Sequence, residues 1–565
     1  MRLLLPRKSD WTGVAVAGGD HDRLDYGYHC EGDLETFVYG HPCHSPAGGW
    51  LSAAEACQLF QMHGGSMTEQ LDGAFAILFL DPRQRECTVI TDPCRVYSFY
   101  YATGAEGMAI SDRLEEVVTA SGRRTLDKRA LVEFLATEMV LGEHTLFEGV
   151  QTFGGGTVST ITASLEVSTR RYWHFPDPPH GERVTLDELT TEFSRHVAYG
   201  RQLSESISMP LTGGFDSRAV LAVSLSETQK FHLYTHGLPG CEDIQLASRI
   251  AQRLGLRHAV YLLGKSHARQ IPERTAELVS AFDGMNNGVT YSHMADTLAR
   301  EAGKGESYFP GSSGGMLKAN YMPVDPPATG NLTELATIIR GCIQRRRNLA
   351  ILTDCDSQQA AAIIEESIRA ELERYPLENP VSLAEQFYLV NRVANYGAMN
   401  LRYIGRRFRL FDPYLGRRLL ELVPRLDLDD KRQKRVHRHI IAHNGGGLAN
   451  MEATAGRVVN RRNPMLLARS ALRQGLWHAS LQFRKRSGHD ILRFGTIDYL
   501  RWLRDAQGDF VRQVLDPGDL QLVGVLDGPQ VAQLVEDYLA GRDYDSAFIG
   551  RLITLELYLK KINRS

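Results

Sequence analysis

The chain has 565 residues and a net charge of −3, with 43% hydrophobic and 23% charged residues, which is typical of a globular protein with a large core. This charge balance excludes a basic surface for nucleic acid and an acidic tail. No apolar run approaches the ~20 residues of a membrane span, and the eight cysteines form no C-x-x-C pair. We therefore expect a cytoplasmic protein without membrane segment, disulfide framework or zinc site.

The first 180 residues are predicted to be rich in β-strands. Aromatic and β-branched runs separated by turn residues occur at Gly73–Asp81, Glu86–Asp92, Val96–Gly104 and Gly155–Phe175. Between them, Asp127–Val140 has apolar residues at helical spacing. The prolines of Pro176–Val184 then indicate a linker between two domains.

After the linker, strand patterns alternate with helix patterns. The segments in chain order are a strand with its glycine turn at 208–214, a helix at 216–225, a strand at 230–237, a helix at 243–255 and a strand at 257–263. This alternation predicts an α/β domain with a doubly wound parallel sheet. Residues 306–315 resemble one more buried strand that ends in a Gly/Ser turn, and the chain beyond about residue 330 is mostly helical.

The segment LTGGFDS, residues 211–217, joins the first of these strands to the first helix. Ligands of open parallel sheets bind at the carboxyl ends of the strands, and the free N–H groups of a helix N-terminus favour phosphate. Gly213 and Gly214 would let the backbone approach a ligand closely. Thr212 and Ser217 would add hydroxyl donors, so the turn is predicted to bind an anion.

Asp216 repels phosphate, and its presence in this turn is explained if it holds a Mg²⁺ ion that bridges phosphate oxygens. The alternative is an ordinary helix start, in which Asp216 or Ser217 caps the helix and the glycines serve only the turn.

The same turn resembles the pyrophosphate loop of ATP pyrophosphatases, and CEDIQLASRIAQRLGLRHAVY (241–261) resembles the following helix and strand of the asparagine synthetase family. Residues 71–101 are similar to that family's N-terminal glutamine amidotransferase domain, and residues 145–175 to the segment joining its two domains. FDPYLGRRLLELVPRL, residues 411–426, is similar to the P-F-L-D…P segment of the same family. After it, Lys434 and Arg438 fit a K-x-x-x-R helix.

The resemblance implies an amidotransferase-like αββα sandwich at 1–180 and, at 181–565, an ATP pyrophosphatase-type synthetase domain with a doubly wound parallel sheet and a helical C-terminal part. It implies ATP and Mg²⁺ as cofactors, a small-molecule or peptide carboxylate and an amine as substrates, and it allows a homodimer. Catalytic roles would fall on Asp216 and Lys434, and metal binding on Asp216 and Asp283. The implied nucleotide contacts are Leu211, Thr212, Gly213, Gly214, Asp216, Ser217, Thr235, His236, Gly237, Gly311 and Ser312.

The sequence departs from the family pattern at its second residue. Glutamine amidotransferases of this class carry a nucleophilic cysteine there, whereas this sequence has Arg2, so we do not expect glutamine hydrolysis. In this respect the chain is similar to β-lactam synthetase, carbapenam synthetase and the lasso peptide cyclases, whose amine comes from a substrate.

A second departure lies in PGSSGGMLKANY, residues 310–321, where Gly315 stands at the position of the family's second metal-binding aspartate. Three interpretations are open. Another carboxylate, Asp283 or Glu242, completes the metal site; or Lys318 replaces the charge of the metal with an ammonium group; or catalysis has been lost. We favour the first, because the turn and Asp216 are intact.

These observations predict an ATP-dependent, AMP-forming amide ligase of natural-product or peptide biosynthesis, which joins an acid and an amine within one molecule or between two. The alternatives are an ammonia-dependent asparagine synthetase and a non-catalytic nucleotide-binding protein.

Overall fold

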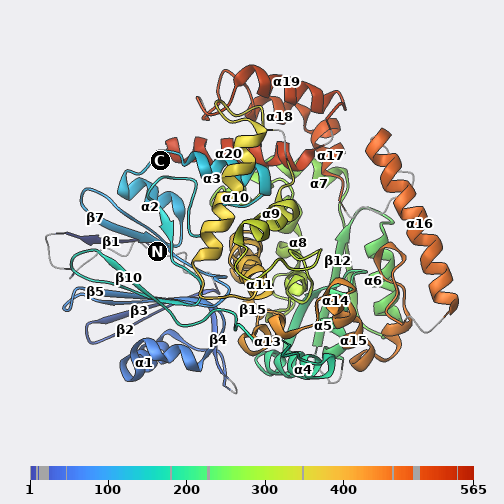
Figure 1. The fold of residues 1–565 in the computed structure, drawn as a ribbon, viewed down its shortest axis with the longest axis horizontal. Helices are drawn as coiled ribbons and strands as arrows, with labels where there is room; N and C mark the ends of the chain where they lie inside the picture. Colours follow the sequence, from blue (N-terminus) through green and yellow to red (C-terminus); the bar gives the residue numbers. More distant parts are fainter. Residues whose placement is uncertain are drawn as a thin grey trace.

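The computed structural model describes residues 2–7, 11, 24–45, 48–178, 181–225, 230–346, 349–460, 464–487, 497–522, 524–543 and 545–564. Two antiparallel sheets form the N-terminal part, and a parallel sheet surrounded by helices follows (Figure 1). Among the described residues, no helix has both the length and the apolar character needed to cross a membrane.

The two N-terminal sheets are stacked, with helices on their outer faces (Figure 1). The first has the order β1 (Arg2–Pro6), β7 (Gly107–Ser111), β6 (Tyr100–Thr103) and β8 (Gln151–Thr152). The second has the order β10 (Val167–Arg171), β9 (Thr157–Ile161), β5 (Glu86–Thr91), β4 (Leu71–Asp81), β3 (Leu34–His44) and β2 (Tyr26–Glu31). Helix α1 (Ala53–His63) covers β2 and β3, and α2 (Leu114–Ser121) covers β6 and β7. This arrangement is the predicted αββα sandwich.

Strand β4, in the middle of its sheet, is apolar on both faces. Ala74, Ala76 and Leu78 belong to the core that includes residues of β1 and β7. The alternate residues Phe75, Ile77 and Phe79 belong to a second cluster, which includes the inner face of α1. Because successive side chains of a strand point to opposite faces, a strand in the middle layer must be apolar throughout.

The third sheet is parallel, with the order β13 (His258–Leu262), β12 (Lys230–Gly237), β11 (Ser206–Pro210), β14 (Ser307–Tyr308) and β15 (Arg409–Leu410). The chain adds β12 and β13 on one side of β11 and β14 and β15 on the other, so the strand order reverses between β11 and β14. This is the predicted doubly wound sheet. The predicted domain boundary at residue 180 lies outside the described residues, because 179 and 180 are not among them.

Helices cover both faces of the parallel sheet and form the C-terminal part (Figure 1). Those between the sheets and along the parallel sheet are α3 (Lys128–Thr137), α4 (Leu186–Gln202), α5 (Asp216–Ser224), α6 (Glu242–Arg253), α7 (Lys265–Ala281) and α8 (Ser292–Glu301). The next are α9 (Leu332–Ile343), α10 (Ser357–Glu373), α11 (Pro380–Phe387), the π-helix η3 (Tyr388–Gly397), α12 (Ala398–Gly405), α13 (Arg417–Leu422), α14 (Leu428–Arg432) and α15 (Arg435–Asn444). The last are α16 (Pro464–Ser487), α17 (Tyr499–Arg501), α18 (Gly508–Val514), α19 (Gly528–Leu539) and α20 (Ser546–Arg564).

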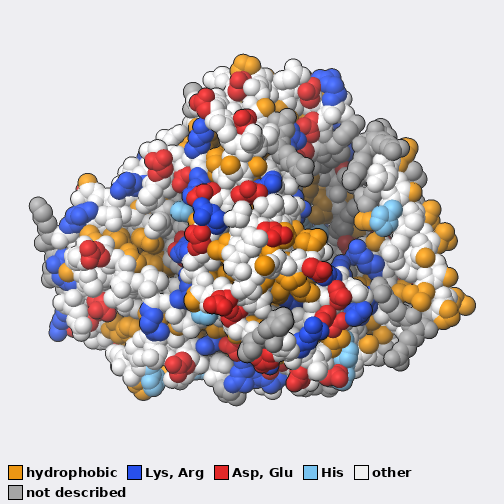
Figure 2. Space-filling model, viewed as in Figure 1, with side chains coloured by type: hydrophobic (Ala, Val, Ile, Leu, Met, Phe, Trp, Pro, Cys, Tyr) orange, Lys and Arg blue, Asp and Glu red, His pale blue; other side chains and the backbone are white. Residues whose placement is uncertain are grey.

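The surface in Figure 2 carries interspersed positive and negative side chains, as the small net charge leads one to expect. Apolar side chains are most exposed along α16, at the right of the view. They are Met465, Leu467, Leu472, Leu476 and Phe483.

The packing of α4 depends on a glycine. A Cβ atom on Gly200 would overlap the ring of Phe411, which follows β15. We therefore expect Gly200→Ala to lower the free energy of unfolding by about 1–3 kcal/mol through overpacking. Urea denaturation measures this change. Gly475→Ala in α16 is the control, because a Cβ there meets no neighbour, and it should be neutral or stabilise the protein by up to ~1 kcal/mol. Equal effects of the two variants would contradict the prediction.

Candidate active site at the reversal of strand order

Two turns leave the parallel sheet side by side, because β11 and β14 are adjacent where the strand order reverses. Open α/β sheets bind ligands at such a point. A Cβ on Gly311 would lie 2.9 Å from the Ser217 backbone nitrogen, and one on Gly314 would lie 2.7 Å from the Asp216 Cβ. These distances are too short for any side chain, so the 211–217 turn and the 310–315 turn contact each other through glycine.

Gly213 takes part in packing and in a hydrogen bond, and its role as a phosphate contact stays a prediction. A Cβ on this residue would overlap Leu246, and its N–H donates to Asp243 Oδ1 at 2.9 Å. Gly214 has more space: the only neighbour that its Cβ would meet among the described residues is Thr212 Oγ1, at 3.3 Å. Gly214 is therefore the glycine of this turn that leaves room for a ligand.

The start of α5 does not follow the helix-cap alternative. Its N-cap is Phe215, which makes no side-chain capping hydrogen bond. The Ser217 hydroxyl accepts from the Thr212 N–H at 3.1 Å instead. First-turn N–H groups without a capping side chain are available to an anion.

Asp216 lies among cationic and polar groups. Lys318 Nζ is 2.6 Å from its Oδ2, and His437 Nε2 is 3.1 Å from its Oδ1. The Tyr414 hydroxyl donates to its backbone carbonyl at 2.7 Å. Burial alone would raise the pKa of Asp216, but His437 and Lys318 outweigh burial and hold the pKa well below its usual range. The carboxylate is therefore ionised at neutral pH.

These residues do not form the two-carboxylate magnesium site that the sequence suggested. Both oxygens of Asp216 already face Lys318 and His437. At Gly315, a Cβ would overlap the hydroxyl of Tyr388, which occupies the space of a second carboxylate. A metal ion needs several oxygen ligands, and the described residues around Asp216 supply ammonium and imidazole groups instead. The geometry thus favours the second interpretation, in which Lys318 provides the positive charge.

Asp283 is not brought to Asp216, which corrects the first interpretation. Its Oδ2 accepts from the Tyr100 hydroxyl at 3.0 Å and its Oδ1 from the Leu114 N–H at 3.1 Å. Burial raises its pKa to about 6. This carboxylate holds the amidotransferase-like part against the rest of the chain.

Glu242, the other candidate, is also engaged elsewhere. Its Oε2 accepts from the Ala455 N–H at 3.0 Å, and its Oε1 is 2.8 Å from the Arg473 guanidinium. Neither candidate carboxylate is available to complete a metal site beside Asp216.

A cavity of about 390 Å³, which we call the tyrosine cavity, opens beside the 310–315 turn. Among the predicted nucleotide contacts, His236, Gly311 and Ser312 line it. Thr235 does not, because its hydroxyl donates to the carbonyl of Leu211 beneath the turn. Leu211 is buried in the core, and Gly237 ends β12, where its carbonyl accepts from the Leu263 N–H.

Lys434 lines a second cavity of about 660 Å³, which we call the cationic cavity. The cavity is also lined by Phe215 at the start of α5 and by three arginines, Arg432, Arg438 and Arg457. Burial, with help from Arg457 and Lys318, lowers the pKa of Lys434 to about 8. The N-terminus of α5 therefore borders the cationic cavity. The 310–315 turn, which packs against this N-terminus, lines the tyrosine cavity.

Three residues of this region were missed by the sequence reasoning: His437, Tyr388 and Arg392. His437 could have been found, because it lies three residues after Lys434 in a segment already matched to the family. Tyr388 and Arg392 lie in η3, and no motif in the sequence marks them.

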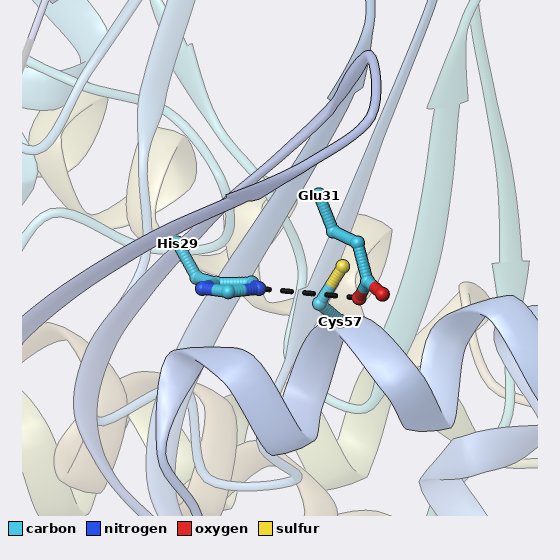
Figure 3. Close-up of side chains that lie close together, drawn as sticks. All are labelled: His29, Glu31 and Cys57. Atoms are coloured by element: carbon cyan, nitrogen blue, oxygen red, sulfur yellow. Dashed lines mark ion pairs between the residues drawn. The ribbon is translucent and has the colours of Figure 1, made fainter.

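A separate group of possible metal ligands lies in the N-terminal part. Figure 3 shows His29 and Glu31 of β2 pointing toward Cys57 of α1, with 3.9 Å between His29 Nε2 and Glu31 Oε2. Burial raises the pKa of the Cys57 thiol. Because the thiolate is the metal-binding form, we assign no metal to this group.

Comparison with known proteins agrees with the order of the two folds. Residues 54–173 match a model of the glutamine amidotransferase domain, and residues 192–304 match the model of asparagine synthase. The antiparallel sandwich and the doubly wound sheet define a two-part protein of amidotransferase-like and synthetase type. The two family models and the curated relatives support a member of the asparagine synthetase family.

Individual relatives are distant. A Mycobacterium tuberculosis protein, named as a glutamine-hydrolysing asparagine synthetase, is 28% identical over 207 residues, 34% of this chain and 32% of the relative. Asparagine synthetase 2 of Arabidopsis thaliana is 24% identical over 35% of this chain and 32% of its own length. Asparagine synthetase 1 of Lotus japonicus is 23% identical over 46% and 45%. The matches thus span between a third and a half of the curated relatives' length.

One solved structure, a glutamine phosphoribosylpyrophosphate amidotransferase of B. subtilis, is 8% identical over 44% of this chain and 75% of that chain, with a TM-score of 0.19. A likeness at this level carries no argument.

The contact between position 315 and Tyr388 can be tested by a double-mutant cycle. We expect Gly315→Ala to destabilise the protein by about 1–3 kcal/mol, because the methyl group overlaps the Tyr388 hydroxyl. In a Tyr388→Phe background the penalty should fall, since the overlapping oxygen is gone. Thermal and urea unfolding measure both. Gly341→Ala in α9, where a Cβ meets no neighbour, is the control. A penalty that is the same in both backgrounds would disprove the overlap.

Proposed function

We propose that the protein is an ATP-dependent amide ligase that forms AMP and pyrophosphate. A carboxylate oxygen of the acid attacks the α-phosphorus of ATP, and the bond to pyrophosphate breaks. An amine then attacks the acyl carbon of the acyl-adenylate, the bond to AMP breaks, and the amine loses a proton. Negative charge develops first on pyrophosphate and then on AMP, so fixed cations are the main requirement.

The single observation that carries this proposal is the position of the α5 N-terminus. Phe215, its N-cap, lines the cationic cavity. On the other side, the turn that lines the tyrosine cavity packs closely against the start of α5, with Gly311 next to Ser217 and Gly314 next to Asp216. A triphosphate in the cationic cavity and an acid in the tyrosine cavity would therefore meet at the first turn of α5. In this arrangement His236, Gly311 and Ser312, which the resemblance implied as nucleotide contacts, would face the acid instead.

Lys318 and Lys434 would compensate the charge that develops. An ammonium group has three donors, and Lys318 uses one of them on Asp216, so two remain for phosphate oxygens. Asp216 would orient Lys318, and Lys434 would act from the cationic cavity. Mg²⁺ would arrive bound to ATP rather than in a site built by the protein.

The amidotransferase-like part would serve as a structural and substrate-shaping module. Burial raises the pKa of the thiols of Cys43, Cys87 and Cys94, so these are poor nucleophiles. The amine would then come from a substrate, either the same molecule as the acid, which gives a ring, or a second one. All eight cysteines are free, which supports a reducing compartment such as the cytoplasm.

Pyrophosphate release from ATP in the presence of Mg²⁺ and a panel of acids, with and without amines, tests the activity. We expect Asp216→Asn and Lys318→Met each to reduce release by at least ~100-fold, because both disturb the fixed charges around the transferred group. Asp509→Asn, on a fully exposed side chain, is the control and should match the parent. Full activity of the Asp216 variant would refute its role. ATP binding without release on any acid would instead favour a non-catalytic nucleotide-binding protein.

The pH dependence tests Lys434. Its pKa is lowered to about 8 and its charged form is the useful one, so single-turnover pyrophosphate release should fall as the pH rises through about 8. Lys434→Arg keeps its charge at these pH values, and its decline should therefore move to higher pH even if its maximal rate is lower. Identical profiles for the two proteins would exclude Lys434 as the titrating group.

A further inference from the structure

In the part of the chain that the structure describes, the lining of the tyrosine cavity is rich in tyrosine and contains a cation but no carboxylate. Five tyrosines line it: Tyr234, Tyr291, Tyr308, Tyr388 and Tyr396. Most of the other lining residues are apolar or uncharged polar, and Arg392 is the one Lys or Arg among them. Among the described residues that line it there is no aspartate or glutamate. The volume of about 390 Å³ is that of a small-molecule site.

Arg392 supplies a cation to the wall of this cavity. Its guanidinium stacks 3.6 Å from the ring centroid of Tyr396. Its nearest carboxylate is that of Glu138, at 3.9 Å between Nη1 and Oε2, which is longer than a hydrogen bond. A guanidinium has five donors in a planar fork that matches a carboxylate, so Arg392 can bind an acid without first breaking a close ion pair.

The two histidines of the cavity add no positive charge. His236 and His293 lie with ring centroids 4.5 Å apart. Burial lowers the pKa of His236 to about 4 and that of His293 well below its usual value. Both rings are therefore neutral near pH 7, and Arg392 is the cation that an anionic ligand would find.

The position of the cavity connects it to the reaction. Tyr388 reaches both the cavity and the space beside Gly315, and Arg392 follows it in the same π-helix. Such π-segments are frequent at functional sites. A carboxylate between Arg392 and the Gly311–Ser313 turn would lie next to the first turn of α5.

We propose that the tyrosine cavity binds the acid substrate, and that it selects an aromatic or apolar carboxylic acid that has no free ammonium group near the carboxylate. The assignment rests on the proposed ligase function. Arg392 pairs with the carboxylate and the tyrosine rings enclose the apolar body. An α-ammonium group would be buried without a counter-ion, which is costly. Free aspartate, with one ammonium and two carboxylates, is therefore a poor ligand.

Binding to the full chain tests this assignment without ATP. The probes are 3-phenylpropionate, L-phenylalanine, which adds the ammonium group, L-aspartate, and 3-phenylpropanol, which lacks the carboxylate. Isothermal calorimetry at pH 7 should rank 3-phenylpropionate first, with L-phenylalanine at least about tenfold weaker and L-aspartate weaker still. Tighter binding of L-aspartate than of 3-phenylpropionate would overturn the proposal.

Variants test whether Arg392 is the cation that binds the carboxylate, and the alcohol probe shows whether the cavity of each variant is still folded. Arg392→Gln should weaken 3-phenylpropionate by about tenfold or more and leave 3-phenylpropanol within about twofold, which also shows that the cavity is intact. Arg340→Gln, on an arginine that pairs with Glu365 away from the cavity, is the matched control and should leave both unchanged. If Arg392→Gln weakened the acid and the alcohol by the same factor, the role of Arg392 would be overturned. The same would follow if the variant bound 3-phenylpropionate as tightly as the parent protein does.

Pyrophosphate release with the same probes separates this proposal from the ligase function. Release with 3-phenylpropionate and not with L-aspartate supports both. Release with L-aspartate alone would leave the ligase function standing and overturn the selected acid class. Binding of 3-phenylpropionate that depends on Arg392, without release on any acid, would support the cavity assignment and count against the ligase function.

Discussion

The close packing of two glycine turns is the constraint on which the rest of this site depends. Gly311 contacts the Ser217 backbone and Gly314 contacts Asp216, at distances that no Cβ permits. This contact exists because β11 and β14 are neighbours at the reversal of strand order. It fixes the start of α5 beside the tyrosine cavity, and it brings Lys318 within 2.6 Å of Asp216. The helix N-terminus, Lys318 and the wall of the tyrosine cavity are thereby brought next to one another.

The charge arrangement at Asp216 differs from the carboxylate pair that the family resemblance implied. Tyr388 fills the space beside Gly315, and Lys318 and His437 occupy the oxygens of Asp216. A carboxylate held between an ammonium and an imidazole fixes the positions of both groups. Lys318 thus pairs with Asp216 next to position 315, where the resemblance implied a second metal-binding carboxylate.

The amidotransferase-like part contributes to the site through η3. Asn391 of η3 accepts from the Gly142 N–H at 2.8 Å, and Asn395 donates to the carbonyl of Val140 at 2.7 Å. Glu138, the C-cap of α3, is the carboxylate nearest to Arg392. The same π-helix carries Tyr388, Arg392 and Tyr396 into the tyrosine cavity. The N-terminal sandwich therefore supports the wall of a cavity in the synthetase part.

The sequence by itself determined the two folds and the place of the 211–217 turn between a strand and a helix of the parallel sheet, because strand and helix periodicities and the glycine turn are local properties of the chain. Only the tertiary structure decided the partners of Asp216. It turned Asp283 toward Tyr100 and Leu114 and engaged Gly213 in packing. It also collected the lining of the tyrosine cavity from elements far apart in the chain, namely β11, β12, β14, α8, η3 and α12. Contacts between distant segments follow from how the layers stack, and a motif records only neighbours along the chain.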